Sequence, residues 1–154
     1  QLLSPQFFKR KKMRRNIIIN ADDLGLSPGV NQAILKAHNL GFLSHASLMA
    51  NTEYFEEAVS EIIPNCKNLK IGVHVNLTCA KALYVENILA ENGLLKNDFV
   101  KLLFKRKTKK VLDSLENEIE LQILKIKDKG IEIADIDGHE HVHIIPSINK
   151  IVRK

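Results

Sequence analysis

Short apolar runs and segments of helical periodicity alternate along most of the chain. Residues 16–20 form a continuous β-rich run, which is typical of a strand buried on both faces. In the segment that follows, Ser27 offers a cap, Pro28 occupies a first helical position and Gly41 offers a stop, so the pattern predicts a helix. The apolar run at residues 45–50 predicts a second strand.

The same alternation continues to the end of the sequence. Residues 52–63 begin with Thr52 and an acidic turn and have apolar residues at helical spacing, which predicts a second helix. The remaining predicted elements are a strand at 69–77, a helix at 108–129, a strand at 131–137 and the start of a helix at 146–154. In the helix at 108–129 one side is apolar and the rest is densely charged.

Strands separated by helices imply a parallel sheet, because a parallel pair needs a crossover that is usually a helix. Such a sheet fits a doubly wound α/β fold or a (β/α) barrel. Four strands followed by the start of a helix amount to half of an eight-stranded barrel, so we expect residues 16–154 to be the N-terminal part of one domain. The first and fourth strands would then have unpaired edges, which favours association with another chain and makes a homodimer a candidate state.

Composition and charge narrow the range of partners. The chain has 154 residues, of which 45% are hydrophobic, and a formal charge of +5. Much of that charge comes from the Lys and Arg residues among the first 15, so the remainder is nearly neutral. We predict that residues 1–15 are a disordered, dispensable head and that Met13 is the natural start. The lysine-rich segment 101–110 fits a solvated helix and loop, and no nucleic-acid partner is expected.

The sequence also argues against a membrane protein. No stretch has the apolar length that a membrane span or a secretory signal requires, so no membrane partner is expected. Cys66 and Cys79 lack the spacing of a zinc knuckle or a disulfide framework. A reducing cytoplasm is therefore the expected location.

Polar residues collect where the predicted strands end. Asp22 and Asp23 follow the first strand, and His74 lies in the third. The cluster after the fourth strand consists of Asp137, His139, His141 and His143. Because the carboxyl edge of a parallel sheet is where α/β folds place their chemistry, we expect these side chains to lie near one another.

Strand geometry aligns several of these residues. His74 shares its face with Gly72 and Asn76, and the three histidines after the fourth strand share a side if that segment is extended. Two imidazoles and a carboxylate form a three-ligand set for a divalent cation and leave positions open for water or substrate. The alternative is a role as helix caps or hydrogen-bonded core residues, which we expect for His38 and His45.

Three motifs, in this order, resemble the YdjC-like carbohydrate deacetylases, a family that includes chitooligosaccharide deacetylases. They are "NADDLG" at 20–25, "GVHVNLT" at 72–78 and "DGHEHVH" at 137–143, and the resemblance runs from residue 16 to about 146. It implies a (β/α) barrel and metal-dependent hydrolysis of an N-acetyl group on a sugar. Family members are considerably longer, which agrees with a half barrel. The sequence departs from the family pattern at Leu24, at Glu140 and in the segment 79–83, where the family often has a Gly and a Pro.

Carried over to this sequence, the resemblance also implies roles for individual residues. The metal ligands would be Asp23, His74 and His139, and Asp22 would be the general base. The general acid is unassigned: Asp137, His141 and His143 are candidates for it or for residues that support the ligands, and the alternative is a residue in the missing half of the barrel. The expected cofactor is one divalent metal ion, Mg or Zn, and the expected substrate is an N-acetylated sugar.

These residue types suit amide hydrolysis, which needs an activated water, a polarised carbonyl and a proton for the leaving amine. A divalent cation lowers the pKa of bound water and polarises the acetyl oxygen, while a carboxylate beside the metal takes the proton. Asp23 can hold the metal while Asp22 reaches the water, because neighbouring side chains on extended backbone point in different directions.

Two other interpretations remain open. The same ligand set serves Fe(II) oxygenases, which also need a redox co-substrate. A truncated, non-catalytic remnant would keep the three motifs and lack the rest of the barrel. We therefore expect the chain of 154 residues by itself to hydrolyse an N-acetylated sugar slowly.

Overall fold

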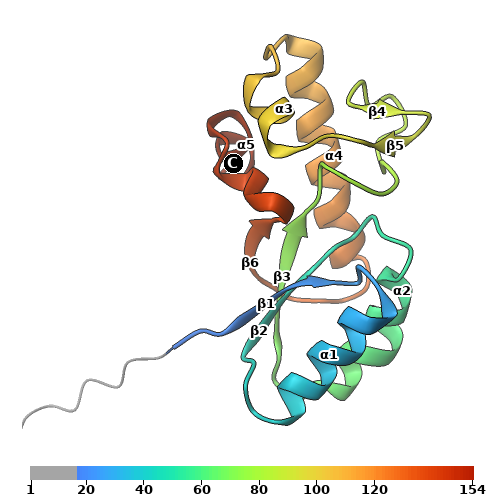
Figure 1. The fold of residues 1–154 in the computed structure, drawn as a ribbon, viewed down its shortest axis with the longest axis vertical. Coiled ribbons are helices and arrows are strands. Elements are labelled where there is room, and N and C mark those ends of the chain that lie inside the picture. Colours follow the sequence, from blue (N-terminus) through green and yellow to red (C-terminus); the bar gives the residue numbers. More distant parts are fainter. Residues whose placement is uncertain (1–16) are drawn as a thin grey trace, which may run out of the picture.

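Four parallel strands form the main sheet of this mixed α/β protein, whose computed structural model describes residues 17–154 (Figure 1). The strands are β1 (Asn20–Leu24), β2 (His45–Leu48), β3 (Lys70–Val75) and β6 (Ile133–Gly138), and they lie in the order β1-β2-β3-β6. Within this sheet, each strand pairs with the strand of the same sheet that follows it in the sequence. The order shows no reversal of the kind that marks a doubly wound sheet.

The first strand lies later in the sequence than predicted. β1 begins at Asn20, whereas Ile17, Ile18 and Ile19 are outside any strand and have exposed fractions of 77%, 65% and 49%. The prediction of a doubly buried strand at 16–20 is therefore wrong for the described part of that run. The physical reason is position: β1 is at the edge of the sheet, so the apolar run before it has no neighbouring strand on one side. The predictions for residues 1–15 and for Met13 fall outside the described residues.

The other three strands and three of the four predicted helices are confirmed; the helix predicted to start at 146 is α5 (Pro146–Val152). Helix α1 (Pro28–Asn39) begins where the hydroxyl of Ser27 accepts a hydrogen bond from the Val30 amide. Helix α4 (Lys109–Lys127) has the equivalent cap at Thr108. A single core of buried apolar side chains joins the sheet to these helices; its members include Leu48, Val73, Val75, Phe55, Leu115 and Ile119.

The second predicted helix differs in form. It consists of a short α-helix, α2 (Phe55–Glu57), followed by the π-helical turn η1 (Ala58–Ile62) and the 3-10 turn η2 (Ile63–Asn65). Thr52 does not cap it: the cap position is Tyr54, which makes no side-chain capping hydrogen bond, and the Thr52 hydroxyl donates to the Gly25 carbonyl at 2.7 Å. That bond ties the segment after β2 to the segment after β1.

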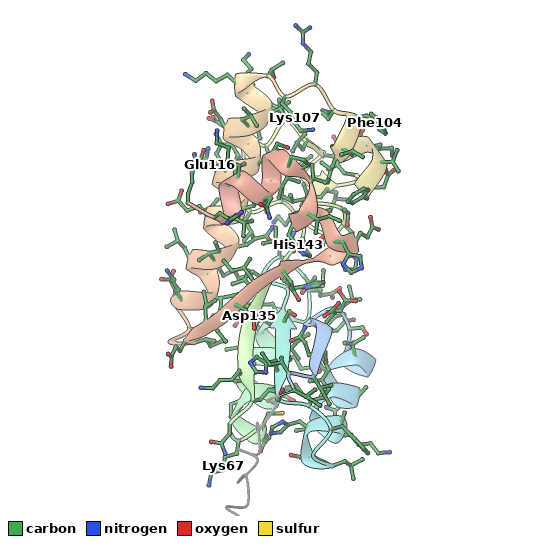
Figure 2. All side chains as sticks on the ribbon, turned by 90° about the vertical axis from the view of Figure 1, so that its left-hand side faces the viewer. Lys67, Phe104, Lys107, Glu116, Asp135 and His143 are labelled. Atoms are coloured by element: carbon green, nitrogen blue, oxygen red, sulfur yellow. The ribbon has the colours of Figure 1, made fainter. Side chains whose placement is uncertain are left out.

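The long connection between β3 and α4 is partly ordered into small elements. The hairpin β4 (Ala90–Glu91) and β5 (Leu94–Leu95) is followed by helix α3 (Phe99–Phe104). In Figure 1 the carboxyl ends of β3 and β6 point toward the end of the molecule that carries α3 and this hairpin. Figure 2 places Phe104 and Lys107 at that end and Lys67 at the opposite one.

The segment after β6 is not extended. Residues His139–Ile144 form the 3-10 turn η3, and α5 (Pro146–Val152) follows. Glu140 and His141 have φ angles of 51° and 57°, so the backbone turns sharply after His139. The condition under which the three histidines would share a side is thus not met. Among residues 17–154, none of the helices combines the length and the apolar content of a membrane span.

Candidate metal centre

Asp23, His74 and His139 meet at the carboxyl edge of the sheet. One carboxylate oxygen, Asp23 Oδ1, lies 3.0 Å from His74 Nε2 and 2.7 Å from His139 Nδ1. One potential ligand atom from each of the three residues lies within 4.8 Å of the others. The three side chains come from β1, from β3 and from the turn after β6, so only the folded sheet brings them together. We call these three residues the triad.

Backbone conformation separates the two adjacent carboxylates. Asp23 has a φ of 66°, and the pairing of β1 with β2 is irregular between Ala21 and Leu24. Asp is among the few residues that tolerate this left-handed region. Asp23 consequently faces the two imidazoles, while the exposed Asp22 accepts a hydrogen bond from Asn20 Nδ2 at 2.7 Å.

A second carboxylate fixes the orientation of His74. The His74 ring is 2% exposed, and its Nδ1 lies 2.6 Å from Asp137 Oδ1. Because a carboxylate only accepts, this contact places a proton on Nδ1, and Nε2 is the ring nitrogen that faces Asp23, at 3.0 Å. Ser47 donates to the other oxygen of Asp137 at 2.6 Å. Burial acts to raise the pKa of Asp137, but the hydrogen bonds from His74 and Ser47 outweigh burial and the pKa is lowered.

Asp22, His74 and Asp137 form a second group of potential ligands in the described residues. In this group His74 Nδ1 is already the donor to Asp137, and Asn20 Nδ2 lies within reach of both carboxylates, 2.7 Å from Asp22 and 3.4 Å from Asp137. Each member therefore has a partner in the protein. The group is better described as the hydrogen-bonded support of the triad than as a second cation site.

The surroundings of His139 raise its pKa strongly. A hydrogen bond with Cys79 is the largest cause; burial opposes it and contact with Asp23 adds to it, so the pKa of His139 is raised to about 9. With no cation bound, the protonated imidazole thus forms an ion pair with Asp23 at neutral pH. Contact with His139 lowers the pKa of the Cys79 thiol in turn. Sequence reasoning missed this pair, because Cys79 lies outside the three motifs and is 60 residues from His139.

The other candidate residues lie around the triad rather than in it. His141 is exposed, and its ring centroid is 6.2 Å from that of His143. His143 Nδ1 is buried and has no hydrogen-bond partner among the described residues. Figure 2 shows His143 near the middle of the molecule, above Asp135. Neither His141 nor His143 belongs to a group of potential ligands.

The two histidines expected to be structural make local contacts. His38 lies within hydrogen-bonding distance of the backbone oxygens of Leu43 and Lys67, at 3.0 and 2.9 Å. His45 contacts the Ser44 hydroxyl at 2.9 Å. These contacts agree with a role in holding turns together.

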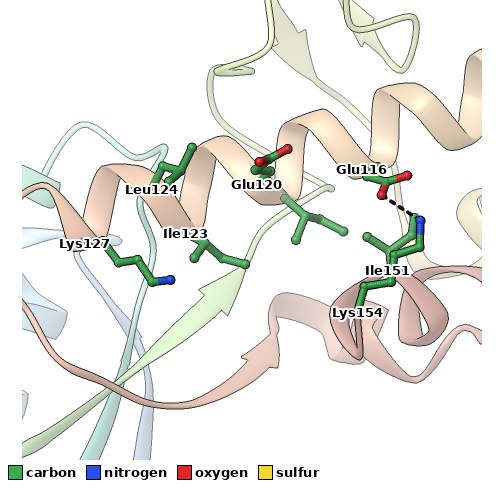
Figure 3. Close-up of a pocket in the computed structure, with 8 residues that line it drawn as sticks. Glu116, Glu120, Ile123, Leu124, Lys127, Ile151 and Lys154 are labelled. Atoms are coloured by element: carbon green, nitrogen blue, oxygen red, sulfur yellow. Dashed lines mark hydrogen bonds and ion pairs between the residues drawn. The ribbon is translucent and has the colours of Figure 1, made fainter.

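The donor set of the triad suits a divalent cation. Two imidazole nitrogens and one carboxylate oxygen, one of the nitrogens oriented by Asp137, are typical of sites that leave coordination positions for water or substrate. The hollow of about 320 Å³ between α4 and α5, which includes Glu116, Ile123 and Ile151, contains none of these residues (Figure 3). The triad is therefore the candidate functional site.

Comparison with known proteins gives consistent results. The family model described as "YdjC-like protein" matches residues 16–154. A carbohydrate deacetylase of Brevibacillus brevis is 34% identical over 140 residues, which are 90% of this chain and 54% of the relative. A chitooligosaccharide deacetylase of Citrobacter koseri is 33% identical over 141 residues, 91% of this chain and 55% of the relative. The chain thus spans about half the length of these curated relatives.

A solved structure is similar as well. The crystal structure of a "putative cellobiose-phosphate cleavage protein" from Enterococcus faecalis V583 superimposes with a TM-score of 0.75 at 29% sequence identity. The match covers 87% of this chain and 52% of that one. Its coverage agrees with the coverage of the curated relatives.

Proposed function

The chain belongs to the YdjC-like protein family, and from this premise we propose that it is the N-terminal part of a metal-dependent carbohydrate deacetylase. The reaction would be hydrolysis of an N-acetyl group on an amino sugar of the chitooligosaccharide type. The names of the relatives in Brevibacillus brevis and Citrobacter koseri support the reaction class. The single observation that carries the proposal is the convergence of Asp23, His74 and His139 within 4.8 Å.

One divalent ion would be held by Asp23, His74 and His139. When bound, such an ion lowers the pKa of a water molecule and polarises the acetyl oxygen. Two imidazoles among three ligands favour Zn over Mg, which prefers oxygen ligands. The contribution of the protein is orientation, because the Asp137 carboxylate holds His74 Nδ1 and so directs Nε2 toward Asp23, where the ion would bind.

Asp22 would act as the general base. Its carboxylate is exposed and therefore accessible to water and substrate, and the hydrogen bond from Asn20 holds it beside the triad. His141 and His143 remain candidates for the general acid that protonates the leaving amine. His143 is the stronger candidate of the two, since its buried Nδ1 has no hydrogen-bond partner among the described residues, whereas His141 is exposed.

The sheet order supports a (β/α) barrel for the whole protein. Four parallel strands in sequential order, followed by α5, would make the first half of such a barrel. β1 and β6 each pair with only one strand in the described residues. Formation of a homodimer and the cytoplasmic location stay predictions.

Acetate release tests the reaction class. The chain and a version extended to the length of the relatives would be incubated with an N-acetylated chitooligosaccharide and Zn²⁺ or Mg²⁺. We expect acetate from the extended version, slow release from the shorter chain, and loss of both with a chelator. Acetate release without oxygen would distinguish hydrolysis from Fe(II) oxygenase chemistry. No acetate from either version would favour the non-catalytic remnant.

Replacement of the proposed base tests its role. Asp22→Asn keeps the shape of the side chain and leaves the triad intact, so metal content should be unchanged. The rate should fall by roughly 10²- to 10⁴-fold, the contribution typical of a general base. Loss of metal from Asp22→Asn would instead assign Asp22 to the ligands.

A further inference from the structure

Glu118 is a fully buried carboxylate on α4, with an exposed fraction of 0%. Its oxygens accept hydrogen bonds from the backbone amides of Leu83 at 3.0 Å and Tyr84 at 2.9 Å. They also accept from the side-chain amides of Asn87 at 3.2 Å and Gln122 at 2.9 Å. None of the ion pairs among residues 17–154 includes Glu118. The carboxylate is therefore held by N–H donors alone.

A carboxylate in this position is not explained by packing. Removing a carboxylate from water is costly unless hydrogen bonds replace the lost hydration, and an apolar residue of similar size would avoid that cost. What the carboxylate provides is attachment: three of its four donors belong to residues 83–87, in the connection that follows β3. Glu118 thus fixes this segment, which we call the β3 loop, to α4.

Gln122, one turn further along α4, fixes the end of β3 itself. Its Nε2 donates to the Asn76 carbonyl at 2.7 Å, and its Oε1 accepts from the Asn76 amide at 2.9 Å. Asn76 comes directly after β3, two residues after His74. Gln122 therefore holds both the backbone amide and the backbone carbonyl at the end of the strand that carries His74. The same Nε2 also donates to Glu118, which makes Glu118 and Gln122 one hydrogen-bonded unit.

Asn76 extends the connection to Cys79. Its side-chain oxygen accepts from the Cys79 amide at 3.2 Å, and its side-chain nitrogen donates to the Cys79 carbonyl at 2.8 Å. A continuous set of hydrogen bonds therefore leads from α4 to Asn76, two residues after His74, to Cys79 and to the β3 loop.

We propose that Glu118 and Gln122 are positioning residues of the deacetylase site, with separate tasks. Gln122 holds the end of β3 and with it the metal ligand His74. Glu118 holds the β3 loop in the conformation that binds the sugar, since this loop leaves the carboxyl edge of the sheet, where α/β folds bind their ligands. The assignment of the two tasks rests on the proposed function, whereas the attachment of the loop does not.

Glu118→Gln and Gln122→Met separate the two tasks. Glu118→Gln replaces one acceptor oxygen with an NH₂ group, which faces N–H donors and loses their hydrogen bonds. Gln122→Met keeps the length of the side chain and removes both bonds to Asn76, together with one of the four donors to Glu118; the three donors in the β3 loop stay. Glu120→Gln is the matched control, because Glu120 lies on the exposed face of the same helix, beside the hollow between α4 and α5 (Figure 3).

Three measurements would be made on each variant: amide hydrogen exchange, Zn²⁺ affinity, and KM and kcat in the version that releases acetate. In Glu118→Gln we expect exchange at Leu83 and Tyr84 to accelerate by about tenfold or more. KM should rise by about tenfold, because binding must now order the loop, while kcat and Zn²⁺ affinity stay within about threefold. In Gln122→Met we expect Zn²⁺ affinity to fall by about 10- to 100-fold. Glu120→Gln should change none of these.

The outcomes distinguish the proposal from a purely structural role and from failure of the proposed function. If Zn²⁺ affinity and kcat fall and KM rises equally in both variants, the substitutions loosen the whole structure, and the proposal is overturned. Unchanged hydrogen exchange at Leu83 and Tyr84 would also overturn the proposal. If no version releases acetate, the exchange and Zn²⁺ results still decide the two attachments. If Glu118→Gln does not fold, Asn87→Ala removes a single donor and must accelerate the same exchange without weakening Zn²⁺ binding.

Discussion

The carboxylates of Asp23 and Glu118 differ in their exposure to solvent and in the groups that contact them. Asp23 has a side chain 29% exposed, and its Oδ1 is shared by imidazoles from two other parts of the sheet. Glu118 is fully buried, and both of its oxygens are occupied by N–H donors. A carboxylate oxygen crowded by imidazole nitrogens is an arrangement that a cation can replace with coordination bonds. A carboxylate surrounded by amide donors is already satisfied, so it fixes structure instead.

The largest expected effect on stability is at Glu118. Glu118→Ala would leave the amides of Leu83 and Tyr84 buried without an acceptor, together with the donors of Asn87 and Gln122. The free energy of unfolding should fall by about 3 kcal/mol or more, since each buried unpaired donor costs about 1–3 kcal/mol. Denaturant titration measures this, with Glu120→Ala as the control. A loss below about 1 kcal/mol would show that the two carboxylates do not differ as described.

An intermediate effect, on Zn²⁺ affinity, is expected at Asp137, whose carboxylate holds the triad member His74. Asp137→Asn replaces the acceptor of the His74 Nδ1 proton with an amide whose orientation can reverse, so His74 is less firmly held. Zn²⁺ affinity should fall by about 10- to 100-fold. Asp135→Asn, on the exposed part of the same strand, is the control. Equal Zn²⁺ affinities in the wild type and Asp137→Asn would mean that Asp137 does not support the triad.

The smallest effect is expected at Asp23 in the metal-free protein. Asp23→Asn keeps a residue that tolerates a φ of 66°, whereas alanine would add backbone strain. The charge is lost from two partly exposed contacts, with His139 and with His74 Nε2, so the free energy of unfolding should change by less than about 1 kcal/mol. Thermal unfolding in a chelator measures this change. A loss as large as that in Glu118→Ala would mean that Asp23 is structural after all.

The sequence predicted the order of elements and the meeting of three motifs, because hydrophobic periodicity and the common edge of a parallel sheet determine both. It misplaced β1, since periodicity cannot distinguish an edge strand from a central one. It also left open whether residues 139–143 are extended, and the turn depends on positive φ angles at Glu140 and His141, which have no periodic signature. Glu118 belongs to the charged part of the predicted helix at 108–129, and periodicity does not show that it is buried, because three of its donors lie more than 30 residues away.

The central claim is that the triad binds one divalent cation, and calorimetric titration of Zn²⁺ into the wild-type chain and Asp23→Asn tests it most directly. Asp23→Asn is the suitable variant because it removes the ligand charge and preserves the backbone. The account predicts one ion per wild-type chain and an affinity lower by more than about 100-fold in Asp23→Asn, beyond the effect of losing a supporting residue. Equal Zn²⁺ affinity in the two proteins, or no binding to the wild type, would contradict it.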